Sequence, residues 1–252
     1  MKGTLHGKVA LVTGGSRGLG AALAQALAAE GADVAISYAS SADKADAVVG
    51  ALRAQGVRAR AIRSDQADTR SAKSLIDQVI QHFGKLDILV NNAAIAVQGQ
   101  TVDDPAPDTA RLDHQWQVNV LGAVATTRTA APVLQDGGRI LFIGSLLGSR
   151  VLFPGAADYA GTKAAIAGYA KGAARDLGRR NITVNVIQPG VMPTDMAQEV
   201  LGDDVPGALL DLHPIRRIAT LEEVAAMAVF LAGPNGGYIT GGILDIAGGA
   251  GI

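Results

Sequence analysis

The stretch that decides the fold is Val9-Ala-Leu-Val-Thr-Gly-Gly-Ser-Arg-Gly-Leu-Gly-Ala21. Its apolar residues 9–12 have the length of a buried strand, and the alanine-rich run 21–29 that follows has the composition of a helix. Three glycines, at positions 14, 18 and 20, lie between them. A strand that passes through such glycines into a helix is typical of a dinucleotide-binding βαβ unit.

Each glycine has a physical role in this interpretation. Gly14 permits the tight turn, Gly18 allows the backbone to approach a pyrophosphate, and Gly20 allows the helix to pack closely on the strand. The helix N-terminus presents unpaired N–H groups and a positive dipole end to the phosphates. We therefore predict a phosphate-binding turn, with a glycine-rich turn that binds no ligand as the alternative. Its residues are Gly14, Ser16, Arg17, Gly18, Leu19 and Gly20.

The alternation of apolar runs and helical stretches continues along the chain. It predicts one α/β domain over residues 1–252, with a Rossmann-type, doubly wound parallel sheet of about seven strands and helices on both faces. Gly31, Gly56, Gly84 and Gly178 stand just past helical runs, where a left-handed cap is favoured. The expected strands are 9–12, 33–37, 57–62, 86–90, 139–143, 182–187 and 242–246, and the expected helices are 21–29, 42–54, 69–83, 109–131, 159–177 and 221–231.

Composition narrows the class of protein. The 252 residues include 22 basic and 23 acidic side chains, and the net charge of −1 gives no general attraction to nucleic acid or to an anionic membrane. There is no cysteine, which excludes disulfides, thiolate metal sites and cysteine nucleophiles, and we predict no metal site. No apolar run approaches the roughly 18 residues of a membrane span. We expect a cytoplasmic protein that acts on a small molecule.

The end of the second predicted strand bears on the choice of cofactor. An NAD site favours Asp or Glu about 20 residues after the glycines, where it binds the ribose 2′-hydroxyl. Here the stretch reads Ser37-Tyr-Ala-Ser-Ser41, with no carboxylate before Asp43. Arg17, Ser40 and Ser41 can instead bind a 2′-phosphate, since charge-assisted contacts to phosphate are strong. We predict NADP(H) in preference to NAD(H), with Arg17 as a solvated loop cation as the alternative.

Tyr159 and Lys163 are spaced for catalysis. They lie four residues apart in Asp158-Tyr-Ala-Gly-Thr-Lys163, so both side chains share one face of a helix, and Ser145 lies fourteen residues before the tyrosine. A phenol with the usual pKa of about 10 is a poor proton carrier near neutrality, and a nearby cation lowers that pKa. We therefore expect Lys163 to lower the pKa of Tyr159.

In order and spacing these motifs resemble those of the short-chain dehydrogenase/reductase family, in the branch that includes 3-oxoacyl-carrier-protein reductases. The resemblance runs nearly end to end and rests on residues 13–20, Asp65, Asn91-Asn-Ala-Ala94, Asn119, Ser145, Tyr159-Ala-Gly-Thr-Lys163, Pro189-Gly190 with Thr194, and Ile243-Leu-Asp-Ile-Ala-Gly-Gly249. It implies that Tyr159 and Lys163 also touch the cofactor. The further cofactor contacts it implies are Asp65, Gln66, Asn92, Ala93, Pro189, Gly190, Met192 and Thr194.

The resemblance also implies catalytic roles. Ser145 holds the carbonyl oxygen and Tyr159 delivers the proton as a general acid. Lys163 tunes the phenol and holds the nicotinamide ribose, and Asn119 binds a water that supplies protons, although a structural role for this asparagine is the alternative. Asp65 is expected either to contact the adenine amino group or to cap the turn after the third strand.

The predicted activity is the NADPH-dependent reduction of a ketone to a secondary alcohol by hydride transfer. Two alternatives remain at this point: an NAD-linked alcohol dehydrogenase that works mainly in oxidation, and a non-catalytic dinucleotide-binding scaffold. The family resemblance also implies a homotetramer.

Apolar loops suggest the kind of substrate. Residues 191–214 mix apolar side chains with Pro and Gly, which is typical of a mobile substrate lid or of an ordinary helix-loop cover. His114 and Trp116 are interpreted as packing or interface residues. An apolar or cyclic ketone is favoured by the neighbouring apolar loop residues Val97, Leu146, Leu147, Val151, Leu152 and Phe153.

Overall fold

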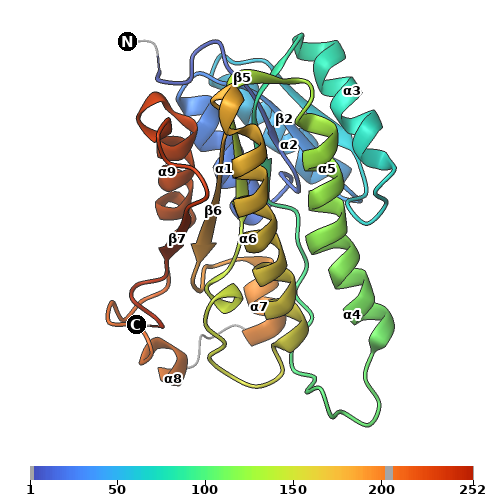
Figure 1. Ribbon diagram of the computed structural model, residues 1–252, viewed down its shortest axis with the longest axis vertical. Helices are drawn as coiled ribbons and strands as arrows, with labels where there is room; N and C mark the ends of the chain where they lie inside the picture. The colour runs from blue at the N-terminus through green and yellow to red at the C-terminus, as the bar shows by residue number, and fades with distance from the viewer. Residues whose placement is uncertain (1–2, 202–206, 252) are drawn as a thin grey trace.

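A seven-stranded parallel sheet organises the computed structural model, which describes residues 3–201 and 207–251 (Figure 1). The strand order is β3-β2-β1-β4-β5-β6-β7, and all neighbouring strands in this order are parallel. The predicted α/β class and doubly wound parallel sheet are therefore confirmed. The strands are β1 (Val9–Val12), β2 (Asp33–Tyr38), β3 (Ala59–Arg63), β4 (Leu86–Asn91), β5 (Leu134–Ile143), β6 (Thr183–Pro189) and β7 (Ile243–Ile246).

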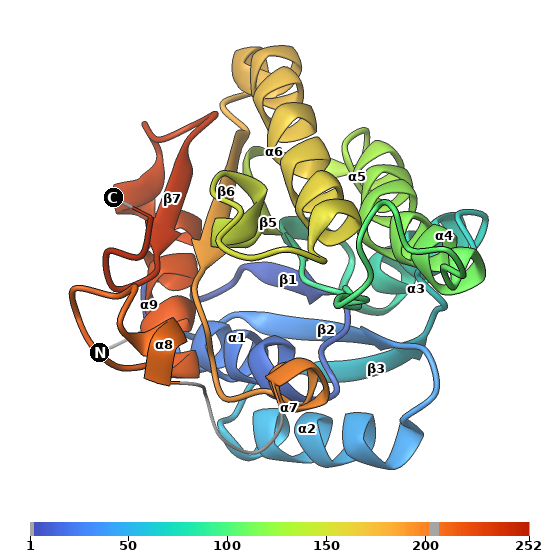
Figure 2. The same ribbon diagram turned by 90° about the horizontal axis from the view of Figure 1, so that it is seen from below.

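Helices cover both faces of the sheet, as Figure 2 shows. Because both faces are covered, β1, β4 and β6 are buried at every position and carry mostly apolar side chains. Within the described ranges, no helix has both the length and the apolar character that crossing a membrane requires. One face is covered by α1 (Gly18–Ala29), α2 (Ala42–Ala54) and α9 (Leu221–Ala232), and the other by α3 (Ser71–Phe83), α5 (Ala123–Ala130) and α6 (Ala157–Leu177).

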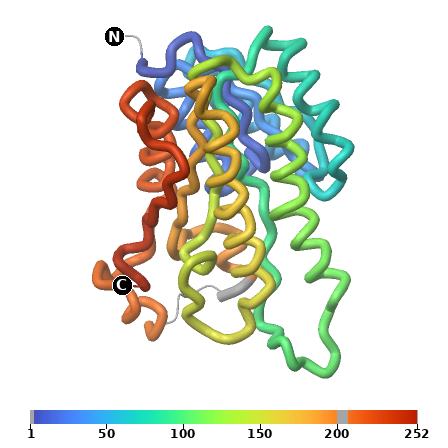
Figure 3. Tube along the Cα trace, in the orientation of Figure 1, coloured from blue at the N-terminus to red at the C-terminus, as the bar shows by residue number. Residues whose placement is uncertain are grey.

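The carboxyl ends of the strands meet at one edge of the sheet, toward the bottom of Figures 1 and 3. After β1 the chain adds β2 and β3 on one side and then returns to add β4 on the other, so the strand order reverses between β1 and β4. In open α/β sheets, ligands bind at such a switch point. The short helices α7 (Asp195–Leu201) and α8 (Gly207–Leu210) lie at this edge. They form part of the predicted lid 191–214, of which residues 202–206 lie outside the described residues.

The predicted helix 109–131 is divided into three pieces. Two α-helices, α4 (Thr109–Trp116) and α5, flank a π-helical turn, η1 (Gln117–Gly122). The π-helical turn coincides with a close approach, because a Cβ on Gly122 would lie 2.0 Å from the backbone oxygen of Gln66. Sequence periodicity does not reveal a π-turn, and such turns are frequent at functional sites.

The start of β5 differs from the prediction. The strand begins at Leu134 rather than at residue 139, and Leu134 pairs with Leu86 of β4 before the register shifts. Gly137 has a φ of 74°, a conformation that glycine adopts without strain. The polar residues and glycines at 135–138 concealed this first part of the strand.

The predicted glycine caps are confirmed at three positions and wrong at the fourth. Gly31, Gly56 and Gly84 have φ values of 87°, 85° and 85°. Gly178 has a φ of −58° and begins a 3₁₀ turn that extends α6. The left-handed conformation is taken three residues later by Asn181, with a φ of 55°, because asparagine tolerates this region better than most residues.

Candidate active site

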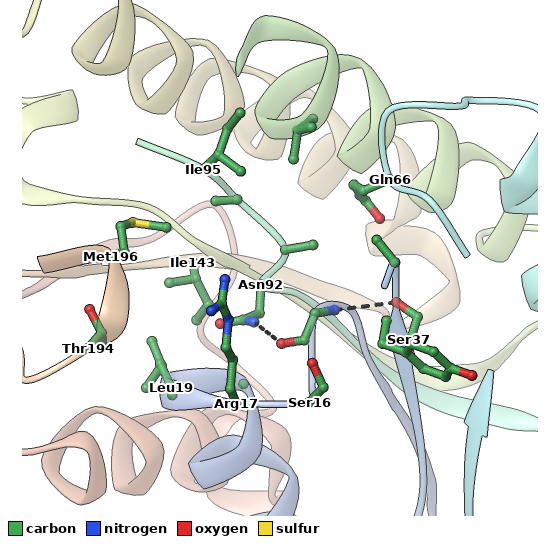
Figure 4. Close-up of a pocket in the computed structure, with 18 of the residues that line it drawn as sticks. Ser16, Arg17, Leu19, Ser37, Gln66, Asn92, Ile95, Ile143, Thr194 and Met196 are labelled. Atoms are coloured by element: carbon green, nitrogen blue, oxygen red, sulfur yellow. Dashed lines mark hydrogen bonds between the residues drawn. The ribbon is translucent and has the colours of Figure 1, made fainter. Parts of the chain in front are cut away.

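A groove of about 320 Å³ lies at the switch point, between the glycine turn, the ends of β2 and β4, and the start of α7 (Figure 4). It is lined by most of the residues that the sequence predicted to bind a cofactor. Pro189 and Gly190 do not line it; they line a second, smaller cavity beside it. The predicted residues in the groove are Gly14, Ser16, Arg17, Gly18, Leu19, Gly20, Ser40, Ser41, Asp65, Gln66, Asn92, Ala93, Tyr159, Lys163, Met192 and Thr194.

The glycine turn has the geometry of a phosphate cradle. Gly14 and Gly18 have φ values of 64° and 52°, which only glycine adopts readily. A Cβ on Gly20 would lie 2.2 Å from the backbone oxygen of Gly14, so any side chain there would displace the turn. The amide of Asn92 donates to the backbone oxygens of Thr13 (2.9 Å) and Gly14 (3.2 Å). Asn92 therefore braces the turn from β4, which the sequence did not indicate.

The far end of the groove contains an unpaired donor. Gln66 is buried and its Nε2 has no hydrogen-bond partner among the described residues. Its backbone oxygen packs against Gly122. An unpaired buried donor destabilises a fold by about 1–3 kcal/mol, and a ligand acceptor such as an adenine nitrogen would relieve it. Asp65 lines the groove and caps its own turn, since its Oδ1 accepts from the backbone N–H of Ala67 at 2.9 Å.

A cluster of charges lies at the mouth of the groove. Arg17 donates to Asp195 of α7 with an Nη1–Oδ2 distance of 2.9 Å, and Lys44 of α2 lies 3.8 Å from the same oxygen. The three side chains are about half exposed, so the pairs are weakly stabilising. The sequence predicted Arg17 at this site but neither Lys44 nor Asp195, because side chains brought together from three distant segments carry no local signal.

Ser145, Tyr159 and Lys163 meet beside the groove. The tyrosine and the lysine are 8% and 3% exposed, and the lysine Nζ lies 5.6 Å from the centre of the phenol ring. Lys163 donates to the backbone oxygen of Ile143 at 3.0 Å. Ser145 begins the turn η2 (Leu146–Gly148), where its Oγ accepts from the N–H of Leu147 at 3.2 Å. The end of β5 thus supplies both the serine and the carbonyl that holds the lysine.

Burial controls the proton affinities of this cluster. It raises the pKa of Tyr159 to about 12, and a hydrogen bond with Ser145 opposes the shift without cancelling it. The same burial lowers the pKa of Lys163 to about 8. The expected lowering of the tyrosine pKa by Lys163 is therefore wrong for the groups that the protein itself supplies, because desolvation of the phenol is the largest influence on its pKa and raises it. At neutral pH the phenol carries its proton and can donate it.

Asn119 connects two parts of the site. It lies in the π-helical turn, where its Oδ1 accepts from the N–H of Ile95 at 2.9 Å and its Nδ2 donates to the oxygen of Ile95 at 2.9 Å. The same Nδ2 donates to Thr162 Oγ1 on α6 at 3.2 Å. Both amide N–H groups are used within the protein. The side chain therefore fixes the loop after β4 against the helix that carries Tyr159 and Lys163.

The second cavity, of about 140 Å³, adjoins the groove. Ser145 lines only this cavity, Lys163 lines only the groove, and Tyr159 lines both. Of the apolar residues predicted around the substrate, Val97 and Val151 do not line it: the first is buried elsewhere and the second is 59% exposed. Those that do are Leu146, Leu147, Leu152 and Phe153, joined by Met192, Met196 and Leu209 from the predicted lid.

Other predicted and unpredicted residues are clarified by the structure. Trp116 donates from Nε1 to Asp158 at 2.8 Å and packs against Gly161, which agrees with a packing role. His114 is exposed and lines the groove, so packing does not describe it. Among residues 3–201 and 207–251 there is no cluster of potential metal ligands.

The chain is similar to known proteins over nearly its whole length. A family model described as enoyl-(acyl carrier protein) reductase matches residues 14–251. A 3-oxoacyl-[acyl-carrier-protein] reductase of Staphylococcus aureus (strain N315) is 38% identical over 248 residues, which cover 96% of this chain and 97% of the relative. The cyclic-di-GMP-binding biofilm dispersal mediator protein of Escherichia coli (strain K12) is 40% identical over 98% of each chain.

A solved structure is also similar. A short chain dehydrogenase from Burkholderia cenocepacia J2315, in complex with NADP, superposes with a TM-score of 0.92 and 46% identity. The match covers 99% of this chain and 100% of that chain.

Proposed function

The chain belongs to the short-chain dehydrogenase/reductase family of oxidoreductases, and from that premise we propose that it reduces a ketone to a secondary alcohol with NADPH. The observation that carries the proposal is the position of Tyr159, buried where the groove and the smaller cavity meet. A proton donor at this junction touches both a cofactor in the groove and a carbonyl in the cavity. When bound, the nicotinamide dinucleotide supplies the hydride.

The protein's own groups supply the proton and the alignment. Negative charge develops on the carbonyl oxygen as the carbonyl carbon is reduced, so a donor must meet that oxygen. Ser145 orients the oxygen from the wall of the cavity, and Tyr159 transfers its proton to it as a general acid. Lys163, held by the backbone oxygen of Ile143, stabilises the phenolate that results. Because the side chain of Asn119 is fully used, we assign its water-binding role to main-chain atoms of the π-helical turn.

Two features of the groove support NADP(H) over NAD(H). Arg17 and Lys44 place two positive charges around the carboxylate of Asp195 at its mouth, and Ser40 and Ser41 line the same groove. A 2′-phosphate would compete with Asp195 for the arginine. The complex of the Burkholderia cenocepacia relative with NADP agrees with this assignment.

The glycine cradle and the unpaired Nε2 of Gln66 fit a dinucleotide of either kind. A dinucleotide-binding scaffold without catalysis is the second candidate function, since one relative is named as a cyclic-di-GMP-binding mediator. The retained Ser145, Tyr159 and Lys163 favour the enzyme, because a scaffold has no need of a buried phenol and a buried lysine. We also propose that the protein is located in the cytoplasm.

A homotetramer is also proposed. The large exposed apolar side chains Phe230 and Tyr238, which are 44% and 102% exposed, lie near the edge strand β7. Edge strands with such neighbours are available for pairing with another copy. The mass of the protein in solution, measured by light scattering after size-exclusion chromatography, tests this part.

The experiment that tests the activity is an assay of ketones and secondary alcohols with both cofactors, followed by the absorbance of the reduced nicotinamide. We expect ketone reduction with NADPH, at a kcat/KM about tenfold or more above that with NADH, the ratio that one charge-assisted phosphate contact contributes. A preference for NADH would support the NAD-linked dehydrogenase instead. Dinucleotide binding without turnover on any pair would support the scaffold.

A further inference from the structure

We propose that the substrate is a small ketone whose apolar skeleton also carries a hydroxyl group, and that Gln98 and His213 select it by binding that hydroxyl. The inference rests on the proposed function, because it places the carbonyl of the substrate at Tyr159 and Ser145. It adds a second point of recognition in the 140 Å³ cavity, which is otherwise lined mostly by apolar side chains and backbone.

Gln98 supplies the first observation. It lines the cavity, and its Oε1 is closed off from solvent with no hydrogen-bond partner among the described residues. Buried polar groups in native proteins are almost always paired, so an exception asks for an explanation such as a missing ligand. The terminal torsion of glutamine is soft, so the carboxamide can turn toward a polar group in the cavity.

His213 supplies a second, independent observation. It is 3% exposed and lines the same cavity from the lid side. Its Nδ1 lies 2.8 Å from the backbone oxygen of Leu209, an acceptor, so this nitrogen carries the proton and Nε2 of the neutral ring is an acceptor. Among the residues that the structure describes, Nε2 makes no hydrogen bond. The cavity is therefore lined by a carboxamide with an unpaired atom and by an imidazole whose Nε2 can accept a hydrogen bond.

A hydroxyl is the group that satisfies this pair. Its single proton can be donated to Nε2 of His213, while its oxygen accepts from the amide nitrogen of Gln98 when the carboxamide is turned over. A carboxylate carries no proton at neutral pH and would leave Nε2 of His213 without a donor. The chemistry of the cavity thus favours a neutral hydroxy ketone over an anionic substrate.

The size of the cavity limits the skeleton. Its volume of 140 Å³ is close to that of a protein cavity that holds one benzene molecule, about 150 Å³. A six-membered ring with its carbonyl directed to the groove is therefore the appropriate probe, since Tyr159, Met192, Thr194 and Met196 line both spaces and connect them.

The test uses matched pairs of substrates. The kcat/KM for 2-, 3- and 4-hydroxycyclohexanone is measured with NADPH against that for the corresponding methylcyclohexanones, which have nearly the same size. We expect at least one hydroxy ketone to exceed its methyl partner by about tenfold or more, the effect of one hydrogen bond formed in a dry pocket. An electronic influence of the hydroxyl on the carbonyl is separated from binding by the variants that follow.

Two variants remove the hydrogen-bonding groups of Gln98 and His213 with little change of shape. Gln98→Met keeps the length of the side chain and removes the amide, and His213→Asn keeps a donor near the position of Nδ1 and removes Nε2. In each variant we expect the hydroxy-to-methyl ratio to fall toward one, mainly through KM. Gln100→Met is the matched control, because Gln100 bonds to the backbone N–H of Asp108 and does not line the cavity; it should keep the ratio of the wild type.

The outcomes distinguish this inference from the proposed function. Reduction of hydroxy and methyl ketones at equal rates would overturn the inference and leave ketone reduction standing. A preference that persists in both variants, or that also disappears in Gln100→Met, would overturn it as well. Failure to reduce any of the six ketones or any other carbonyl compound, with either cofactor, would overturn the proposed function itself.

Discussion

The groove at the switch point and the smaller cavity beside it share Tyr159 but are built in different ways. The groove is shaped by backbone: Gly14 and Gly18 adopt left-handed conformations, and Gly20 and Gly122 allow approaches that a Cβ would block. The cavity is shaped by side chains from loops far apart in sequence, at 96–98, 145–153, 189–197 and 209–213. Steric limits on the backbone fix the shape of the groove, whereas the choice of side chains sets the shape and polarity of the cavity.

This difference predicts how substitutions in the groove and in the cavity affect the protein. A backbone cradle binds a constant chemical group and loses its shape when one methyl is added. A cavity lined with side chains on loops can be altered one residue at a time while the fold is kept. We therefore expect substitutions in the groove to affect every substrate equally and substitutions in the cavity to redistribute activity among substrates.

The largest effect is expected at the residue that the groove and the cavity share. Tyr159→Phe removes the proton donor and keeps the ring, so kcat for ketone reduction should fall about a thousandfold, while the Kd for NADPH changes far less. Steady-state kinetics and fluorescence titration measure the two quantities. Tyr169→Phe is the control on the same helix, since Tyr169 packs edge-on against Phe142 of β5 and lines neither space. A Tyr159→Phe variant with near-normal turnover would remove the tyrosine from the mechanism.

The second largest effect is expected when one methyl group is added to the glycine turn of the groove. In Gly20→Ala the new Cβ would meet the oxygen of Gly14 at 2.2 Å and the amide of Asn92 at 2.6 Å, so we expect the Kd for NADPH to rise about a hundredfold or more. Gly50→Ala, in the exposed face of α2 with no atom within 4 Å of its new Cβ, should stabilise the fold by about 0.5–1 kcal/mol. Calorimetric binding and urea unfolding of both variants test this contrast. Normal NADPH binding by Gly20→Ala would contradict the cradle.

The buried lysine should reveal a conflict between stability and function. The pKa of Lys163 is about 8 in the fold against 10.5 when exposed, so between these values the unfolded chain holds the proton more tightly and stability rises with pH. Lys163→Met lacks this dependence and should be more stable than the wild type at pH 7 by about 1–3 kcal/mol, although inactive.

The difference in unfolding free energy should shrink as pH rises from 8 to 10.5, as measured by urea unfolding at several pH values. Tyr159, whose pKa of about 12 lies above its exposed value of 10.0, lowers stability in both proteins above pH 10 and cancels in the comparison. If the wild type is more stable than Lys163→Met at pH 7, the interactions of the charged lysine offset the cost of burying it.

The smallest effect is expected at the rim, where charges are exposed. Asp195→Asn frees Arg17 and Lys44 for a 2′-phosphate, so the Kd for NADPH should fall about two- to fivefold, with less change for NADH. Added salt should reduce the difference. Asp77→Asn removes a carboxylate from an exposed pair on α3 and serves as the control. An equal effect of Asp195→Asn on the Kd of both cofactors would mean that the charges at the mouth of the groove do not distinguish NADPH from NADH.

The sequence alone determined the parts of this protein that depend on local rules. The apolar strands, the amphipathic helices and the glycines of residues 13–20 specify their own conformations, so the parallel sheet, the turn and most groove residues were predictable. The spacing of Tyr159 and Lys163 likewise follows from the helix repeat.

Only the tertiary structure decided how these parts act on one another. The hydrogen bonds of Asn119 to Ile95 and Thr162, the pairing of Arg17 with Asp195, and the cavity that both Gln98 and His213 line bring together segments that are distant along the chain. The pKa of Tyr159 rises rather than falls because burial depends on everything packed around the phenol. Proximity and desolvation arise when the chain closes, and no local pattern of residues records them.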